Sequence, residues 1–443
     1  MNGARRVAYV NARLVDPASG LDAMGGLLTE DDRIADFGPG LFGIGLLPDG
    51  PPADAPADAE VVDCRGHILA PGLVDMRARI GEPGEEHKET IASASLAAAA
   101  GGVTALACRP DTNPPIDSEP GLEFIARKAR HVKRVKIFPY GCVTRGAAGK
   151  DITEMGLLAE AGAVAFTDGN RAVADSLVMY RALSYATTHG LLVVQHPEEP
   201  RLADGGVMNA GEIATRLGLP GIPRQAEVMM IERDLRLVEL TGARYHVAHV
   251  STADSVDVIR AAKARGLSVT CDTAPPYFAL TEVDVGDYRT FAKLHPPLRG
   301  EMDRRAIVAG LADGTIDVIA SDHDPQDQDV KRLPFAQAEP GVVGLETLLV
   351  LSLELYHKGH LDLLDLLARL TCRPADLLGL PLGRLEVGGP ADLLLFDPDA
   401  PGRIDVNAFV SKSKNSPFDG RPVMGRVLRT VVDGRTVFPF GAG

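Results

Sequence analysis

Cysteine is scarce in this chain of 443 residues. The five cysteines are far apart, and no two form a Cys-x-x-Cys motif: Cys64, Cys108, Cys142, Cys271 and Cys372. The missing motif argues against a structural zinc ion held by four cysteines. An odd, scattered set of cysteines is typical of reduced thiols, so we expect a cytoplasmic protein.

Long apolar runs and an excess of positive charge are missing as well. No stretch of about 18 apolar residues indicates a membrane span. Residues 1–14 lack the basic, apolar and small-residue pattern of a signal peptide. The net charge of −14 argues against nucleic acid or an anionic membrane as the main partner.

What is present is the ordinary composition of a globular protein, with 45% hydrophobic and 24% charged residues. The length exceeds what one simple core needs. A barrel of roughly 250 to 350 residues with a smaller domain would account for it.

The middle of the chain alternates between apolar, β-branched runs and helical stretches such as 89–100 and 226–240. The apolar runs lie at 68–75, 102–108, 135–140, 163–168, 191–195, 243–250, 267–272 and 316–321. Strand followed by helix, eight times, predicts an α/β fold of the (β/α)8 barrel type. An open, doubly wound sheet is the alternative, and the polar residues that follow several strands favour the barrel.

Both ends of the chain contain shorter strand-like segments. These are residues 7–10, 12–16 and 25–29 at one end, and 391–396 and 427–432 at the other. Asp433-Gly434 predicts a tight hairpin, and residues 45–57 predict a surface loop. We therefore expect residues 1–66 and 381–443 to build a small β-sandwich domain, with the barrel formed by residues 67–380.

Imidazoles and carboxylates follow four of the predicted barrel strands. They are Asp168, His196, His249 and Asp322 with their neighbours. Because the carboxyl ends of barrel strands meet at one mouth, these groups predict a divalent metal site, most often zinc. A single histidine at a strand end is more often a structural core residue.

A series of motifs along the chain is similar to the class I dihydroorotases of the amidohydrolase superfamily. The motifs are Pro71 to Gly84, Glu86-His87-Lys88-Glu89-Thr90, Ala99-Ala100-Gly101-Gly102-Val103-Thr104, Pro110-Asp111-Thr112-Asn113-Pro114, His249-Val250-Ser251-Thr252, Pro296-Pro297-Leu298-Arg299 and Gly344-Leu345-Glu346-Thr347. The resemblance covers nearly the whole chain. It implies an amidohydrolase-type barrel and a role in pyrimidine biosynthesis.

The resemblance also implies a mechanism. In that family a hydroxide between two zinc ions attacks a cyclic amide, and an aspartate moves the proton. His196 and His249 match two metal-binding histidines, and Asp322 matches the aspartate. Asp168 matches part of an Asp-Asp-Gly run whose second aspartate is Gly169 here, so a reduced site of His196, His249 and Asp168 would hold one zinc ion at most.

The chain departs from the family where a histidine pair binds metal. Arg77 and Arg79 replace that pair, and a protonated guanidinium has no lone pair for zinc. We expect the two arginines to supply the positive charge of the missing metals beside Asp322 and Asp168.

The substrate pocket changes too. Gly81 replaces an arginine that binds the substrate carboxylate, and Asp111 and His295 replace two asparagines. We place six residues in the altered pocket: Arg77, Arg79, Gly81, Asp111, Asn113 and His295.

Two functions follow from these departures. The first is a dihydroorotase-like protein with little or no activity, which acts as a structural partner of aspartate transcarbamoylase. The alternative is an active cyclic amidohydrolase that converts dihydroorotate to N-carbamoyl-aspartate with a single zinc ion. A homodimer or hetero-oligomer is expected by resemblance.

Overall fold

A computed structural model describes residues 5–42 and 56–439 of the chain. The predicted loop at 45–57 lies almost entirely outside the described residues. Within them, no helix is long and apolar enough to cross a membrane. All five cysteines are free and buried.

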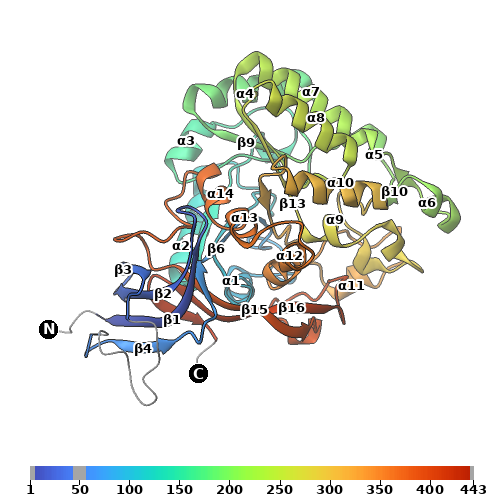
Figure 1. The fold of residues 1–443 in the computed structure, drawn as a ribbon. Coiled ribbons are helices and arrows are strands. Elements are labelled where there is room, and N and C mark those ends of the chain that lie inside the picture. Colours follow the sequence, from blue (N-terminus) through green and yellow to red (C-terminus); the bar gives the residue numbers. More distant parts are fainter. Residues whose placement is uncertain (1–4, 43–55, 440–443) are drawn as a thin grey trace.

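A closed parallel barrel forms the larger part of the molecule (Figure 1). Its strands are β6 (Leu73–Ala78), β7 (Val103–Cys108), β8 (Lys136–Pro139), β9 (Leu192–Gln195), β12 (Arg244–Val247), β13 (Val269–Thr273) and β14 (Val318–Ile319). They pair in the orders β6-β7-β8 and β9-β12-β13-β14. The predicted strand at 163–168 is present only as isolated parallel bridges from Phe166 to Gly141 and Val193. A bridge from His323 to Ala78 closes the ring, so seven strands and this bridging segment fill the eight positions. The predicted (β/α)8 architecture is confirmed.

Helices follow the strands and cover the barrel. They are α1 (Ile91–Ala100), α2 (Glu119–Val132), α3 (Met155–Glu160), α4 (Ser176–His189), α5 (Pro200–Ala203), α6 (Glu212–Leu217), α7 (Gln225–Thr241), α8 (Ala253–Ala264), α9 (Pro275–Ala279), α10 (Glu301–Ala312), α11 (Gln328–Lys331), α12 (Leu348–His357), α13 (Leu363–Ala368) and α14 (Cys372–Leu377). Local sequence sets their starts: the Thr90 side chain accepts from the Ser93 N–H and caps α1.

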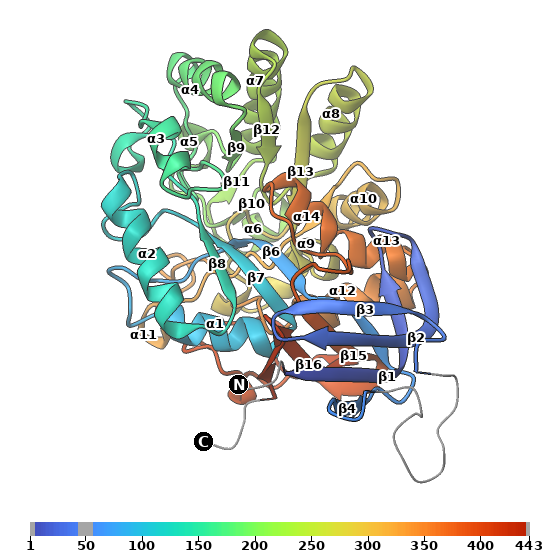
Figure 2. The ribbon, with the colours of Figure 1, turned by 90° about the vertical axis from the view of Figure 1, so that its left-hand side faces the viewer.

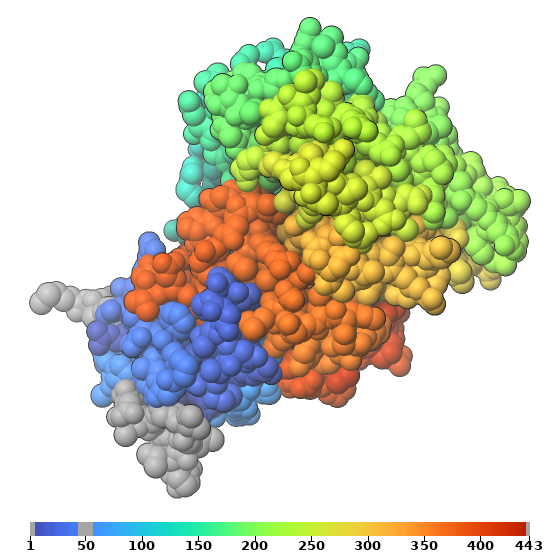
Figure 3. Space-filling view, turned by 45° about the horizontal axis from the view of Figure 1, so that its top comes forward, coloured from blue at the N-terminus to red at the C-terminus, as the bar shows by residue number. Residues whose placement is uncertain are grey.

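The two ends of the chain build one sheet. Its strands are β1 (Arg6–Asp16), β2 (Leu21–Glu30), β3 (Arg33–Pro39), β4 (Glu60–Asp63), β5 (Ile68–Pro71), β15 (Leu393–Arg403), β16 (Pro422–Val432) and β17 (Arg435–Phe438). The order is β17-β16-β15-β5-β1-β2-β3, with β4 on β1. Figure 2 shows the N-terminal and C-terminal strands side by side. In Figure 3 the N-terminal part (blue) adjoins the segment around residues 350–380 (orange).

One predicted barrel strand was wrong in extent. The apolar run at 68–75 is two strands, because Ile68–Pro71 pairs with β1 and β15 in the terminal sheet, and the barrel strand begins at Leu73. The boundaries proposed for the two domains, at residues 66 and 380, stay predictions. A short parallel pair, β10 (Met208–Asn209) with β11 (Gly221–Ile222), lies apart from both sheets.

Candidate functional site

The chemistry-bearing residues of the barrel gather at the carboxyl ends of its strands. Arg77 is in β6, His196 follows β9, His249 follows β12 by two residues, and Asp322 follows β14 by three. In barrels of this kind the reacting groups sit at this end. The structure therefore places these residues at one mouth of the barrel, as the sequence predicts.

Arg77 lies at the centre of the mouth, and its side chain is 1% exposed. Its Nε donates to Asp322 Oδ1 at 2.9 Å, and its Nη2 donates to Asn170 Oδ1 at 2.7 Å. The same Nη2 lies 3.3 Å from His249 Nε2. The expected contact between an arginine and Asp322 is present for Arg77.

Asp322, His249 and His196 form a chain of hydrogen bonds. Asp322 Oδ2 lies 3.0 Å from His249 Nδ1, and His249 Nε2 lies 2.7 Å from His196 Nδ1. Burial by itself raises the pKa of Asp322, but His249 and Arg77 outweigh it and hold that pKa well below its usual range. Burial, and then Arg77, lowers the pKa of His249 well below its usual value. Asp322 is therefore ionised and His249 neutral near pH 7.

The backbones of two of these residues are strained. His249 has φ of 37° and Asp322 has φ of 47°, in the left-handed region that side chains rarely adopt. Such conformations cost about 1–3 kcal/mol each and cluster at active sites and ligand clamps. The fold thus holds His249 and Asp322 in orientations that lower its own stability.

Arg79 takes other partners. Its Nη1 lies 3.4 Å from Asp324 Oδ1, and its Nη2 pairs with Glu85. Arg79 pairs with Glu85 and Asp324 rather than with Asp322, so only one of the two predicted arginine contacts is made. Asp324 is also 3.3 Å from Arg109, whose side chain is 1% exposed.

Sequence reasoning missed Arg109. This residue follows β7 directly and pairs with Asp111, with Nη2 2.6 Å from Oδ2. A charged residue immediately after the apolar run at 103–108 was the available signal. The predicted pocket residue Asp111 is thus neutralised by Arg109, and its pKa lies well below the usual range despite burial.

Asp168 is held away from the two histidines. Its carboxylate accepts from the Thr144 backbone N–H at 2.9 Å and from the Thr144 hydroxyl. Burial raises the pKa of Asp168 to about 6. Zinc binding by His196, His249 and Asp168 stays a prediction, in which Asp168 would first have to leave Thr144.

The backbone conformation and the surrounding atoms at two glycines, Gly169 and Gly81, disfavour a side chain. Gly169 has φ of 73°, and a Cβ there would lie 2.3 Å from Asp111 Cγ, so glycine at 169 and aspartate at 111 suit each other. Gly81 has φ of 68°, and a Cβ would lie 2.6 Å from the Glu89 carbonyl oxygen, so this backbone disfavours any side chain there. The predicted pocket residue Asn113 is exposed.

A second cluster lies beside His196. Glu198 Oε1 is 2.8 Å from His295 Nε2 and 3.8 Å from His196 Nε2. Among residues 5–42 and 56–439, this is the one group of three histidine, cysteine or acidic residues whose ligand atoms all lie within 4.8 Å. The sequence places His295 in the pocket and Glu198 at the end of the fifth barrel strand, but it assigns Glu198 no role in the site.

The two-zinc site of the family does not fit these residues. Arg77 and Arg79 have no lone pair to offer, and the Arg77 guanidinium bonds the Asp322 carboxylate that would face the metals. A charged guanidinium and a divalent cation cannot share this contact without severe repulsion. We therefore derive no step through a pair of metal ions.

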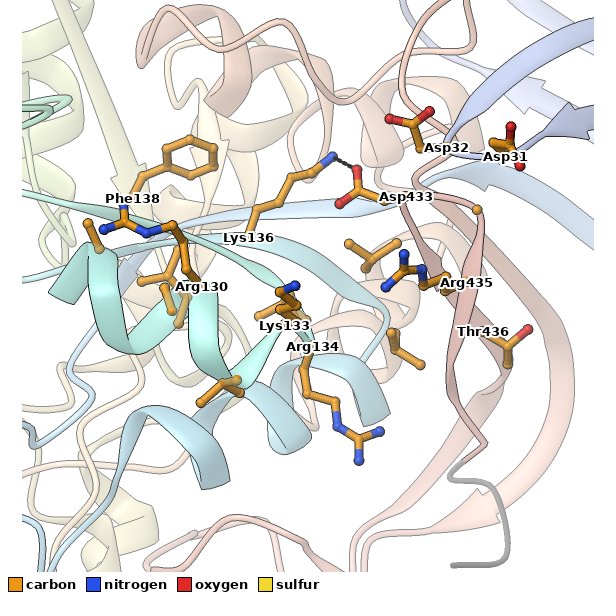
Figure 4. Close-up of a pocket in the computed structure, with 18 of the residues that line it drawn as sticks. Asp31, Asp32, Arg130, Lys133, Arg134, Lys136, Phe138, Asp433, Arg435 and Thr436 are labelled. Atoms are coloured by element: carbon orange, nitrogen blue, oxygen red, sulfur yellow. Dashed lines mark ion pairs between the residues drawn. The ribbon is translucent and has the colours of Figure 1, made fainter. Parts of the chain in front are cut away.

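A pocket of about 270 Å³ opens at the mouth. Arginines 79, 109 and 171 line it with His295 and Asp324. A separate hollow of about 1210 Å³ lies between the α2–β8 region and the C-terminal hairpin, where Lys136 pairs with Asp433 (Figure 4). The pocket at the mouth is lined by Asn170, which bonds Arg77, and by His295, whose ring centroid lies 4.6 Å from that of His196.

The barrel and its mouth define an amidohydrolase-type fold. An L-hydantoinase (dihydropyrimidinase) structure from Arthrobacter aurescens matches with a TM-score of 0.82 and 26% identity, covering 97% of this chain and 95% of that one. A D-hydantoinase structure matches with a TM-score of 0.80 at 23% identity, covering 97% and 95%, and supports the fold alone.

Sequence relatives define the family. The family model described as "Dihydro-orotase-like" matches residues 66–255. A protein of Anaplasma phagocytophilum named dihydroorotase is 47% identical over 98% of this chain and 95% of its own length. One of Citrifermentans bemidjiense with that name is 46% identical over 96% and 98%. The chain belongs to the dihydroorotase family.

Proposed function

We propose that this chain is an active cyclic amidohydrolase of the dihydroorotase type that works with a single divalent ion. The observation that carries the proposal is the strained pair His249 and Asp322. Left-handed backbones cluster at active sites and ligand clamps, and here two of them hold the residues that match a metal-binding histidine and the proton-transferring aspartate of the family. The names of relatives that match nearly the whole chain support the same function.

The reaction adds water to a ring amide carbonyl and breaks the C–N bond, giving N-carbamoyl-aspartate from dihydroorotate. A bound divalent ion would polarise the carbonyl and lower the pKa of the attacking water. Asp322 takes the water proton and returns a proton to the leaving nitrogen. Because His249 and Arg77 together keep the pKa of Asp322 low, Asp322 is a weak base, and we expect slow turnover.

The pocket can accept a small anionic substrate only in competition with carboxylates of this chain. Arg79 already pairs with Asp324, and Arg109 with Asp111 and Asp324, so a substrate carboxylate would have to displace one of these partners to make a paired contact. The pocket excludes large substrates by its volume of about 270 Å³.

One observation favours a second function. Arg77 stands where the metal-binding histidines are expected and satisfies Asp322 without any metal. That arrangement also suits a non-catalytic chain that supports aspartate transcarbamoylase as a structural partner, in a homodimer or hetero-oligomer.

The test is hydrolysis of dihydroorotate by the purified full chain, followed as N-carbamoyl-aspartate formed. We expect slow but measurable turnover that falls at least about 100-fold in Asp322→Asn, since a positioned proton acceptor contributes that much. Asp322→Asn is purified in parallel and serves as the control for a contaminating host enzyme.

Turnover that is equal in the two preparations, or absent at every metal concentration, would contradict the proposal. Absence of turnover together with a stable complex with aspartate transcarbamoylase would establish the second function instead.

A further inference from the structure

We propose that His196, Glu198 and His295 form the site of the single divalent ion, displaced from the metal positions expected in the family. The inference rests on the proposed function for its role in catalysis, but metal binding at these three residues is measurable without turnover. The ligand set shares His196 with the sequence-based prediction and replaces His249 and Asp168.

The geometry of the three side chains is close to that of a metal site. Glu198 Oε1 lies 2.8 Å from His295 Nε2 and 3.8 Å from His196 Nε2. Ligand atoms around a tetrahedral zinc at about 2.0–2.1 Å lie about 3.3–3.5 Å from each other. The three ligand atoms lie within 4.8 Å of one another, and coordination would require small side-chain rotations and the ring hydrogen of His295 on Nδ1 in place of Nε2.

His196 offers an unused lone pair toward this cluster. The side chain is 2% exposed, and its Nε2 is buried without a hydrogen-bond partner. A buried polar atom of this kind is costly unless something occupies the space it faces. The carboxylate oxygen Oε1 of Glu198 lies 3.8 Å from it.

Arg77 and Asp322 determine which nitrogen of His196 carries the proton. Asp322 is an acceptor, so His249 Nδ1 carries a hydrogen and donates to it. Arg77 Nη2 is a donor, so His249 Nε2 is the acceptor on the other side.

The position of the ring hydrogen on His249 then determines the position of the ring hydrogen on His196. His249 Nε2 accepts from His196 Nδ1 at 2.7 Å, which leaves His196 Nε2 with a lone pair. A lone pair facing a carboxylate is repulsive, and a cation between them removes the repulsion. Metal-binding histidines commonly donate their other ring N–H in this manner, and here the acceptor is His249.

Two histidines and one glutamate are a known donor set for catalytic zinc, with a fourth position left for water or substrate. His295 also lines the pocket of about 270 Å³ that Arg79 and Arg109 flank. An ion held by these three residues would therefore lie beside the space that a small anion would enter. Arg77, the residue that blocks the family's metal positions, becomes the group that orients the new site.

The experiment is titration of the metal-depleted full chain with Zn²⁺ by calorimetry and with Co²⁺ by visible absorption. We expect one equivalent to bind, with the cobalt bands of a four- or five-coordinate site. Glu198→Gln and His295→Asn should each weaken binding at least about 100-fold, because losing even a group behind a ligand costs 10–100-fold.

Two further variants make the result specific. Glu199→Gln removes a carboxylate one residue away that accepts from the Leu202 N–H, and it should bind zinc as the wild type does. Asp168→Asn removes a ligand of the alternative set of His196, His249 and Asp168. Because Asp168 is not a ligand in the proposed site, this variant too should leave zinc binding unchanged. Thermal unfolding of each variant confirms that it is folded.

Failure of the wild type to bind zinc would overturn the site. So would loss of binding in Asp168→Asn with retention in Glu198→Gln, because it would identify His196, His249 and Asp168 as ligands. One bound ion with no turnover on dihydroorotate would leave the site standing and contradict the proposed function alone.

Discussion

Arg77 connects three side chains that a metal site would otherwise organise. Its guanidinium bonds Asp322 and Asn170 and lies beside His249, and its side chain is 1% exposed. Taking one partner out of a buried ion pair leaves the other charge without compensation, which costs about 3–5 kcal/mol. The pair Arg77–Asp322 is therefore a structural necessity as well as a feature of the site.

We predict that Arg77→Met and Asp322→Asn each lower the free energy of unfolding by about 3–5 kcal/mol. The double variant should lose less than the sum of the two, with a coupling energy of about 1–3 kcal/mol, because no lone charge remains. Urea unfolding of the four proteins of this cycle measures the coupling. Strict additivity would show that the two side chains do not interact in solution.

The cost of Asp322→Asn should also depend on pH. The folded-state pKa of Asp322 lies below its unfolded value of about 3.9, so the ionised side chain contributes stability above about pH 4. That contribution is lost as the pH falls through the folded-state pKa. Unfolding free energies at pH 7, 4 and 3 should therefore show a penalty that changes little from pH 7 to about pH 4 and shrinks below it, and a penalty that grows toward pH 3 is incompatible with this assignment.

At the scale of elements, helix α7 positions the loop that carries His249. Glu227, in its first turn, accepts from the backbone N–H groups of Ser251 and Thr252 at 3.0 and 3.1 Å. It also accepts from the hydroxyl groups of both residues. One carboxylate thus fixes the segment between β12 and α8.

We expect Glu227→Gln to destabilise the protein by about 1–3 kcal/mol, because the amide N–H₂ would face donors in a buried place. The exposed Glu232 on the same helix is the matched control, and Glu232→Gln should have little effect. Urea unfolding compares the two. Equal effects would mean that the Glu227 contacts do not hold this loop.

The sequence predicts elements better than it predicts contacts. Runs of β-branched residues gave the barrel, but the run at 68–75 contains the end of one sheet and the start of another, and hydrophobicity does not distinguish them. Gly72, between Pro71 and Leu73, is the local sign of that division.

The site is predictable only in part, for the same reason. Strand ends identified His196, His249 and Asp322, because their place in the chain sets their place at the mouth. Glu198 meets His295 from a position 97 residues away, and no periodic pattern reports such a contact. Asp168 bonds Thr144 rather than the histidines because the loop that carries Thr144 lies beside it, which is a tertiary fact.

At the scale of the whole molecule, Lys136 joins the barrel to the terminal sheet. Its Nζ in β8 lies 2.5 Å from Asp392 and 2.8 Å from Asp433, which belong to the C-terminal part of the chain. The side chain of Asp392 is 5% exposed and that of Asp433 is 50% exposed. Only the pair with Asp392 is buried enough to matter much.

We predict that Lys136→Met destabilises the protein by about 1–3 kcal/mol, since it leaves Asp392 without its cation. Asp433→Asn should cost less than about 1 kcal/mol, because that pair is exposed and asparagine suits the left-handed turn. Denaturant unfolding ranks the two variants. A Lys136→Met effect no larger than that of Asp433→Asn would contradict this role for Lys136.

We predict that the whole molecule works with one metal ion, because Arg77 stands where the family resemblance implies a metal-binding histidine. The most direct measurement is dihydroorotate turnover by metal-depleted protein as zinc is added in known ratios. We predict that turnover rises to a plateau at one equivalent of zinc per chain. A plateau at two equivalents, or no turnover at any ratio, would contradict the account.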